Sequence, residues 1–301
     1  MSTDLLVAGS IALDTLDGPF GRVEEELGGS ALYFALAASL ITPVTVVAPV
    51  GREHARAVEE VVGARPIDLR HMAVLDAPTY RWRAQQQGGR NIDFGSQDTI
   101  YDHWTPTVPP GFSGWAFVGS MRPDLQARLA AELDPPASLL AADAMLSYVR
   151  AQPADARDVL RHARWYFCNH EEFAALGGAD RQAFRRQWSL EGLVVKAGAR
   201  GVTAYADGES VHVPALDTHP VVDTTGAGDA VAAGMLAHWL VSGHSHNPLR
   251  ESLAWGVACA SLTIEDIGLR AIASATRAQL DSRVEEVKEC LRRESRSSPA
   301  T

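Results

Sequence analysis

The stretch from Val221 to Ala233, VVDTTGAGDAVAA, constrains the fold of this chain more than any other. Its two β-branched valines predict the end of a buried strand, and Asp223 with the two following threonines predicts a turn. A Gly-Ala-Gly sequence then leads into an alanine-rich helix that is expected to begin near Asp229. A strand, a tight turn and a helix in this order are typical of an α/β protein.

The start of this predicted helix has the properties of an anion site. Its first N–H groups are unpaired and lie at the positive end of the helix dipole, so Gly226, Ala227 and Gly228 could hold an anion with backbone alone. Asp229 would repel a stored anion. It is suited to taking a proton from an alcohol while the N–H groups stabilise a transferred phosphoryl group. The alternative is an ordinary strand-to-helix connection with a capping Asp.

Composition limits the classes of protein and partner. The chain has 301 residues, of which 46% are apolar and 21% charged, as in a soluble globular protein. A net charge of −10 argues against nucleic acid or an anionic membrane as partner. The N-terminus has Asp4 and lacks a basic region followed by a long apolar run, so we expect neither a signal peptide nor a transmembrane helix. The scattered Cys168, Cys259 and Cys290 favour a reducing cytoplasm.

The complete string DTTGAGD resembles the second signature of the ribokinase-like (PfkB) family of carbohydrate and nucleoside kinases. The resemblance implies that Asp229 is the catalytic base and that the backbone of Gly226, Ala227 and Gly228 forms the anion hole. It also implies ATP and Mg²⁺ as cofactors and a sugar-like small molecule as substrate.

Alternating strands and helices after residue 111 predict parallel strands with helical crossovers. Residues 67–104 instead alternate in polarity, which predicts half-exposed antiparallel strands. We therefore expect one domain over residues 1–301 with a three-layer, doubly wound, mainly parallel sheet. A small β lid, formed from about residues 12–26 and 67–104, would close over the substrate, as the resemblance implies.

Candidate substrate-binding residues lie in the first third of the chain. Asp14 follows the first predicted strand, where acids can bind substrate hydroxyls, although a turn Asp is the alternative. Gly28 and Gly29 permit close backbone approach, and Ser30 can cap the next helix. The alternative is that this segment is only a well-capped helix of the core. These positions resemble the family's first signature. The remaining candidates are Tyr33, which stands where ribokinase has Asn, and Arg81 of the lid, whose alternative is a solvated strand arginine.

Candidate cofactor residues lie in the second half. Asn169 and Glu172 fit a helix capping box and also resemble the family's N-x-x-E motif, which implies Mg²⁺ placement by Glu172 through water. Lys196 or Arg200 could pair with phosphate. Gly198 and Gly201 match the family's nucleotide loop in position, with a hairpin turn as the alternative. The resemblance further suggests a K⁺ site near Asp223 and Thr225.

The primary hypothesis is an ATP-dependent kinase that phosphorylates a hydroxyl of a sugar or sugar-like molecule. A nucleoside or cyclitol kinase on the same scaffold is the alternative, and a catalytically silent sugar- or nucleotide-sensing protein is the candidate from another class. Dimerisation through the lid is an additional expectation, because an exposed strand edge can pair with a second copy. His244 and His246 are expected to be solvent-exposed loop residues.

Overall fold

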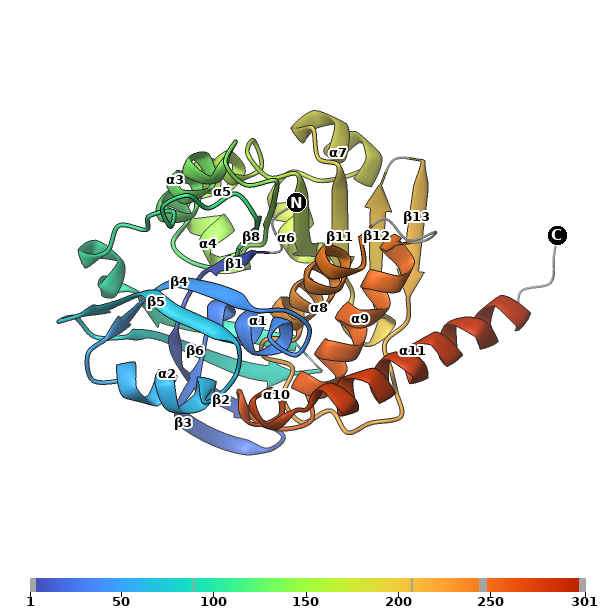
Figure 1. Ribbon diagram of the computed structural model, residues 1–301, viewed down its shortest axis with the longest axis horizontal. Coiled ribbons are helices and arrows are strands. Elements are labelled where there is room, and N and C mark those ends of the chain that lie inside the picture. Colours follow the sequence, from blue (N-terminus) through green and yellow to red (C-terminus); the bar gives the residue numbers. More distant parts are fainter. Residues whose placement is uncertain (1–3, 89, 207, 244–247, 298–301) are drawn as a thin grey trace.

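The computed structural model describes residues 4–88, 90–206, 208–243 and 248–297. These residues form an α/β body with two separate sheets (Figure 1). His244 and His246 lie outside the described residues. Within the described ranges, no helix has both the length and the apolar character needed to cross a membrane.

The larger sheet has nine strands in the order β13-β12-β11-β10-β9-β8-β1-β4-β5. The seven neighbouring strands β11, β10, β9, β8, β1, β4 and β5 pair in parallel. Strands β12 and β13 are added antiparallel at one edge. The three-layer, doubly wound and mainly parallel arrangement predicted from the sequence is therefore confirmed. Its strands are β1 (Leu5–Ala8), β4 (Val44–Gly51), β5 (Ile67–Leu75), β8 (Trp115–Val118), β9 (Leu139–Ala142), β10 (Trp165–Asn169), β11 (Gly192–Lys196), β12 (Val202–Ala206) and β13 (Glu209–Val213).

Helices cover both faces of this sheet, because alternate residues of the central strands face opposite cores. In β1, Leu5 and Val7 belong to one core, and Leu6 and Ala8 belong to the other. The first core includes α1 (Ser30–Ala38), α2 (Ala55–Val62), α8 (Ala227–Ser242), α9 (Pro248–Thr263), α10 (Arg270–Ser274) and α11 (Arg277–Ser297). The second includes α3 (Pro123–Leu133), α4 (Leu146–Ala151), α5 (Pro153–Val159), α6 (His170–Ala175) and α7 (Arg181–Trp188).

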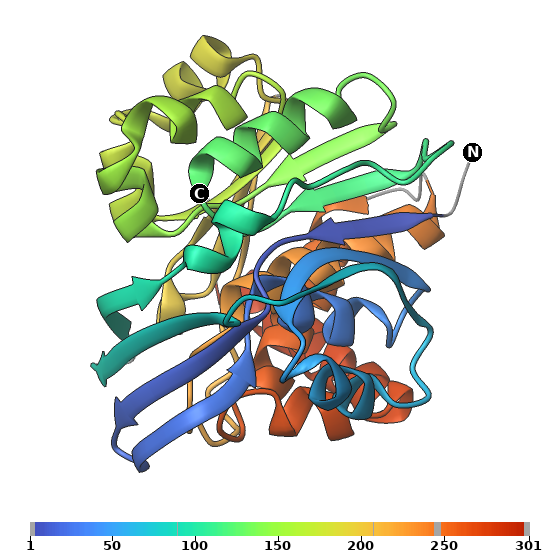
Figure 2. The same ribbon diagram turned by 90° about the vertical axis from the view of Figure 1, so that its left-hand side faces the viewer.

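The smaller sheet has the order β3-β2-β6-β7 and extends away from the body, as Figure 2 shows for the blue and teal strands. We call these four strands the lid. They are β2 (Ala12–Gly18), β3 (Gly21–Gly28), β6 (Tyr80–Gln87) and β7 (Arg90–Gln97). The lid thus combines two segments that lie more than fifty residues apart in the sequence.

The predicted lid boundary at residue 67 is wrong for its first part. Strand β5 pairs in parallel with β4 at the edge of the large sheet. Its apolar residues Ile67, Leu69 and Met72 pack against the main core. A strand with one apolar face fits the edge of either sheet, so alternation alone could not assign it. Beyond β7, residues Thr99–His103 form a 3₁₀ turn, η1.

The buried strand predicted to end at Val221 and Val222 is also absent from the described structure. Val221 is 58% exposed, and the N–H of Val222 bonds the carbonyl of Ile264 after α9. The chain crosses here from the edge strand β13 to the start of α8, so the two valines lie in a connecting loop.

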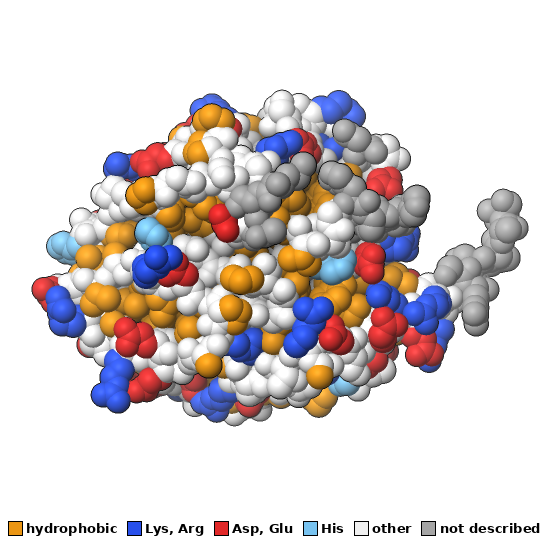
Figure 3. Space-filling view, viewed as in Figure 1, with side chains coloured by type: hydrophobic (Ala, Val, Ile, Leu, Met, Phe, Trp, Pro, Cys, Tyr) orange, Lys and Arg blue, Asp and Glu red, His pale blue; other side chains and the backbone are white. Residues whose placement is uncertain are grey.

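The surface helix α11 carries acidic and basic side chains close together, as expected for a solvated face (Figure 3). Its ion pairs include Arg277 with Asp281 at 2.8 Å and Arg293 with Glu289 at 2.6 Å. Exposed pairs of this kind contribute little to stability.

Candidate active site

The glycine turn before α8 has no room for a side chain. Gly226 has a φ of 74°, in the left-handed region, and a Cβ atom there would lie 2.1 Å from the Tyr33 ring. The N–H of Ala227 bonds the Thr224 carbonyl at 3.3 Å. The N–H of Gly228 lies in the first turn, where a helix has no carbonyl four residues earlier to accept it. This turn therefore has the backbone geometry of an anion-binding helix start.

Asp229 lies in that first turn, and its carboxylate accepts a hydrogen bond of 2.6 Å from the hydroxyl of Ser30. Burial raises the pKa of Asp229 to about 7, and the charge of Asp143 acts in the same direction. The Ser30 bond and the ammonium of Lys196 oppose this increase in the pKa. A carboxylate with a pKa near neutrality is suited to general base catalysis.

Lys196 brings a positive charge to the same turn. Its Nζ lies 2.5 Å from Oδ2 of Asp143, and a Cβ on Gly228 would lie 2.8 Å from that Nζ. Burial lowers the pKa of Lys196, but the carboxylates of Asp143 and Glu172 outweigh burial and hold it above its usual value. The ammonium is therefore charged and lies beside the predicted anion site.

Asp143 was absent from the residues predicted to form the site, although it directly follows β9. It is almost fully buried, and Lys196 at the end of β11 is its ion-pair partner. The sequence places it at the carboxyl end of a predicted strand, where ligands of α/β sheets bind, with a helix-capping role as the alternative.

Asn169 and Glu172 form the capping box of α6. The Asn169 side chain accepts the N–H of Glu171 and of Glu172, at 2.8 and 2.9 Å. In return, Glu172 Oε2 accepts the N–H of Asn169 at 2.7 Å. Burial raises the pKa of Glu172 to about 8. Both side chains therefore cap the helix. The sequence analysis gave this capping role together with the metal role of Glu172.

No group of three His, Cys, Asp or Glu side chains in the described part of the chain is arranged to hold a metal ion. Any Mg²⁺ bound near Glu172 would therefore need oxygen ligands from water and from phosphate, which are the ligands this ion commonly keeps.

Asp14, Gly28 and Tyr33, three of the residues predicted to bind substrate, lie together. A Cβ on Gly28 would lie 2.3 Å from Asp14 Oδ2 and 3.5 Å from the Tyr33 ring. Burial raises the pKa of Asp14 well above its usual value, and Asp223 and Asp229 add to the effect. Gly29 is the N-cap of α1 and has a φ of 99°, and a Cβ there would lie 2.4 Å from the Ser10 carbonyl oxygen.

Tyr33 is 1% exposed, and its hydroxyl has no hydrogen-bond partner among the described residues. Burial raises the pKa of this hydroxyl, and the nearby carboxylates of Asp14 and Asp223 add to the increase. The ring itself lies between Gly28, beside Asp14, and Gly226 of the glycine turn.

The structure does not bring Arg81 to this cluster. Arg81 pairs with Glu25 of β3 at 2.6 Å on the exposed side of the lid. The neighbouring Tyr80 and Trp82 pack against the core instead. Successive residues of a strand face opposite sides, so Arg81 cannot share the inward face with its neighbours.

Gly198 and Gly201 lie in the short connection between the antiparallel strands β11 and β12. Both have positive φ values, 59° and 84°, and a Cβ on Gly201 would lie 2.2 Å from the Val213 carbonyl oxygen. The turn explains both glycines without a ligand, which is the alternative that the sequence left open.

Both carboxylate oxygens of Asp223 accept hydrogen bonds from protein donors. Its Oδ1 accepts the N–H and the hydroxyl of Thr225 at 2.9 and 2.7 Å, and its Oδ2 accepts the N–H of Gly268 at 3.0 Å. This carboxylate therefore fixes the turn that precedes Gly226.

The lid reaches the same turn through two amide side chains that sequence reasoning missed. Gln86 of β6 hydrogen-bonds the hydroxyl of Thr224 at 2.8 Å. Asn91 of β7 donates to the hydroxyl of Thr225 at 2.9 Å. No sequence signal distinguishes these residues from other polar residues of a strand.

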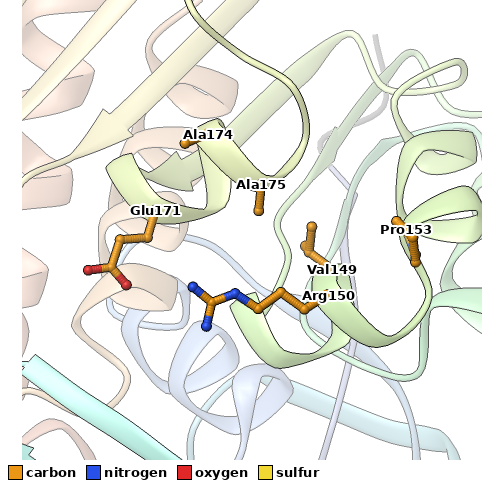
Figure 4. A pocket seen from close by; sticks show the side chains of 6 residues that line it. All are labelled: Val149, Arg150, Pro153, Glu171, Ala174 and Ala175. Atoms are coloured by element: carbon orange, nitrogen blue, oxygen red, sulfur yellow. The ribbon is translucent and has the colours of Figure 1, made fainter.

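A groove of about 500 Å³ lies apart from this cluster, between α4 and α6. Figure 4 shows the charged ends of Arg150 and Glu171 on one side of it and Pro153 on the other. It contains none of the predicted site residues.

A carboxylate in the first turn of a glycine-initiated helix, a paired lysine beside it and a β lid bonded to the same turn define a small-molecule phosphotransferase. The model of the family described as pfkB family carbohydrate kinase matches residues 119–276, more than half of the chain. The chain therefore belongs to the pfkB family of carbohydrate kinases and is a phosphotransferase with an alcohol group as acceptor.

Two comparisons extend over nearly the whole chain. It is 28% identical over 282 residues to a cytidine kinase from Thermococcus kodakarensis, which covers 84% of this chain and 93% of that protein. The nucleoside kinase structure from Methanocaldococcus jannaschii has a TM-score of 0.75 and 18% identity, and covers 95% of this chain and 99% of that one.

A fructokinase from Vibrio cholerae O395, solved with fructose, ADP and calcium ion, has a TM-score of 0.74 at 16% identity. It covers 93% of this chain and 98% of that one. Identities this low establish the shared fold and leave the substrate to be argued from the site.

Proposed function

We propose that this kinase transfers the γ-phosphoryl group of ATP to a hydroxyl of a sugar or sugar-like molecule, with Asp229 as general base. The observation that carries the proposal is the position of the Asp229 carboxylate. It lies in the first turn of α8 and has a pKa near neutrality. Solved structures of the same fold that contain ADP support the use of ATP.

In the proposed reaction, the acceptor hydroxyl gives its proton to Asp229 while its oxygen attacks the γ-phosphorus. The bond between that phosphorus and the oxygen bridging to ADP breaks, and ADP leaves with the electron pair. The N–H groups of the Gly226 to Gly228 turn and the ammonium of Lys196 stabilise negative charge on the transferred group. Asp14, Gly28 and Tyr33 orient the acceptor.

Mg²⁺ fits this site through water. Glu172 is buried near Lys196 and Asp229, and one of its carboxylate oxygens already accepts the Asn169 N–H. The ion would supply charge neutralisation between the phosphates. We propose K⁺ only as an activator near Asp223 and Thr225, supported by a fructokinase structure with bound potassium ion.

A nucleoside is the second candidate acceptor. The nearly full-length relative is named a cytidine kinase, and two shorter matches are a ribose-1-phosphate kinase and a nucleoside kinase. Tyr33, which stands where ribokinase has Asn, supports an acceptor other than ribose. A panel of hexoses, pentoses, nucleosides and inositols, scored by ADP release, separates these classes. Ligand binding without ADP release for any member would favour the sensing protein.

We also propose a homodimer through the lid. Its edge strand β7 exposes Phe94 by 65% and Ile92 by 44%, and exposed apolar side chains on a strand edge favour pairing with a second copy. Light scattering tests this by comparing the molecular mass of Phe94→Glu in solution with that of the unmodified chain.

A cytoplasmic location is supported by the free thiols of Cys168, Cys259 and Cys290 and is checked by fractionation.

The experiment that tests the catalytic assignment is Asp229→Asn. The substitution removes the base and keeps the shape, so kcat should fall by about 10²- to 10⁴-fold while ATP affinity stays close to normal. A variant that turns over near the normal rate would overturn the base role of Asp229.

A further inference from the structure

Ser30 is the first residue of α1, and its hydroxyl is fixed from two sides. Its Oγ accepts the backbone N–H of Ser120 at 3.1 Å and lies 2.6 Å from Oδ1 of Asp229. Its own N–H bonds the Ser10 hydroxyl at 3.1 Å. The residue is only 5% exposed.

Two glycines leave the room that this hydroxyl occupies. A Cβ on Gly119 would lie 2.1 Å from the Ser30 Oγ, and one on Gly9 would lie 3.3 Å from it. A serine has one hydroxyl proton. Because the Ser120 N–H already occupies an acceptor position, that proton is directed at the Asp229 carboxylate.

We propose that Ser30 is a positioning residue for the general base: its hydroxyl holds one carboxylate oxygen of Asp229 and leaves the other to take the proton. This inference rests on the proposed base role of Asp229. It also replaces the expectation that Ser30 binds substrate, because the single donor of its side chain is used within the protein.

The bond favours the ionised form of Asp229, which is the form that accepts a proton. The other charged or titratable groups that act on this carboxylate come from separate elements. They are Asp14 of β2, Tyr33 of α1, Asp143 after β9, Glu172 of α6 and Lys196 of β11. None of these groups is removed by a substitution at position 30, so a change there isolates the contribution of the hydroxyl.

The test is the pH dependence of kcat/KM in Ser30→Ala. The base works only when ionised, so kcat/KM rises with pH through the pKa of Asp229. Loss of the hydrogen bond raises that pKa, so the acid limb should move upward by about one pH unit. On the plateau above it, kcat should fall roughly 10-fold, with the KM for ATP nearly unchanged.

Ser39→Ala is the matched control, because Ser39 is a buried serine at the other end of α1 whose hydroxyl bonds the Leu36 carbonyl. It should keep the acid limb of the unmodified enzyme. Ser30→Thr retains the hydroxyl donor and should also keep that limb. It is the variant to measure if Ser30→Ala does not fold. An unmoved limb in Ser30→Ala, or an equally displaced limb in Ser30→Thr, overturns the inference.

Asp229→Asn separates this inference from the proposed function. If that variant is nearly inactive and Ser30→Ala keeps the normal acid limb, the base assignment stands and the positioning role is wrong. If Asp229→Asn remains active, the base role itself fails, and the positioning role fails with it.

Discussion

Asn91, on the edge strand of the lid, donates a 2.9 Å hydrogen bond to the hydroxyl of Thr225, directly before the glycine that begins α8. The same hydroxyl donates to Asp223 Oδ1 at 2.7 Å, and Asp223 Oδ2 accepts the N–H of Gly268. A continuous set of hydrogen bonds therefore joins the lid, the glycine turn and the loop after α9. The position of the lid is thereby coupled to the residues that face the transferred group.

Replacing Asn91 with Ala should weaken this coupling while the fold persists. Loss of one neutral hydrogen bond of about 0.5–1.5 kcal/mol corresponds to a fall in kcat/KM of roughly 2- to 10-fold. Steady-state kinetics with both substrates measures it. Gln87→Ala is the control, because Gln87 lies on the same hairpin and its amide bonds Gln85 on the exposed side. Equal effects of the two substitutions would count against a specific role of Asn91.

Lys196→Met should impair both stability and catalysis. It leaves Asp143 buried without its partner, which costs about 3–5 kcal/mol of unfolding free energy. Adding Asp143→Asn should recover part of that stability, because the uncompensated charge is removed, without restoring kcat/KM. Chemical denaturation and kinetics on the two single variants and the double variant measure the coupling. Recovery of activity in the double variant would show that Lys196 serves only to neutralise Asp143.

Gly226→Ala should lower the free energy of unfolding for two separable reasons. The left-handed φ costs about 1–2 kcal/mol, and the contact with the Tyr33 ring adds about 1–3 kcal/mol. Gly243→Ala at the other end of α8 is the control, since Gly243 has a φ of 61° and, among the described residues, no atom lies within 4 Å of its missing Cβ. Gly243→Ala should lose only the conformational part in thermal unfolding and keep its activity. Equal losses at the two positions would argue against the Tyr33 contact.

Asp229→Asn should stabilise the protein at pH 8. Burial raises the pKa of Asp229 to about 7 in the folded chain, from an ordinary value of 3.8. The folded state therefore binds more protons than the unfolded state between these values, and this stability is lost as pH rises through 7. Because an Asn amide does not ionise, the variant should keep this stability, and its free energy of unfolding at pH 8 should be higher by roughly 1–3 kcal/mol. Unfolding of the two proteins at pH 5 and pH 8 checks it, since the difference should be clearly smaller at pH 5, which lies closer to the ordinary pKa of 3.8, if Asp229 is its source.

The sequence predicted the elements whose pattern is local. The alternation of strands and helices after residue 111 is such a pattern, and α3 (Pro123–Leu133), which has a Pro at its first position, lies within it. The capping box at Asn169 and Glu172 is likewise a short-range feature, and both of its reciprocal hydrogen bonds are present.

Features that depend on distant partners were predicted less well. Strand β5 was assigned to the lid, although its partner is β4 of the large sheet. Arg81 was predicted either to contact the substrate or to be a solvated strand arginine, and only the structure shows its partner Glu25. Strand pairing is decided by which surfaces remain to be buried, and that information is spread over the whole chain.

By itself, the sequence determined that a glycine turn with an acid in its first helical turn follows a series of alternating strands and helices, because torsional freedom and apolar spacing are local properties. Only the tertiary structure decided that Ser30 bonds Asp229, that Asp143 pairs with Lys196 and that Asn91 bonds Thr225. Each of these contacts joins residues more than fifty positions apart. Their distances follow from packing the two sheets and the helix layers together, which no local pattern encodes.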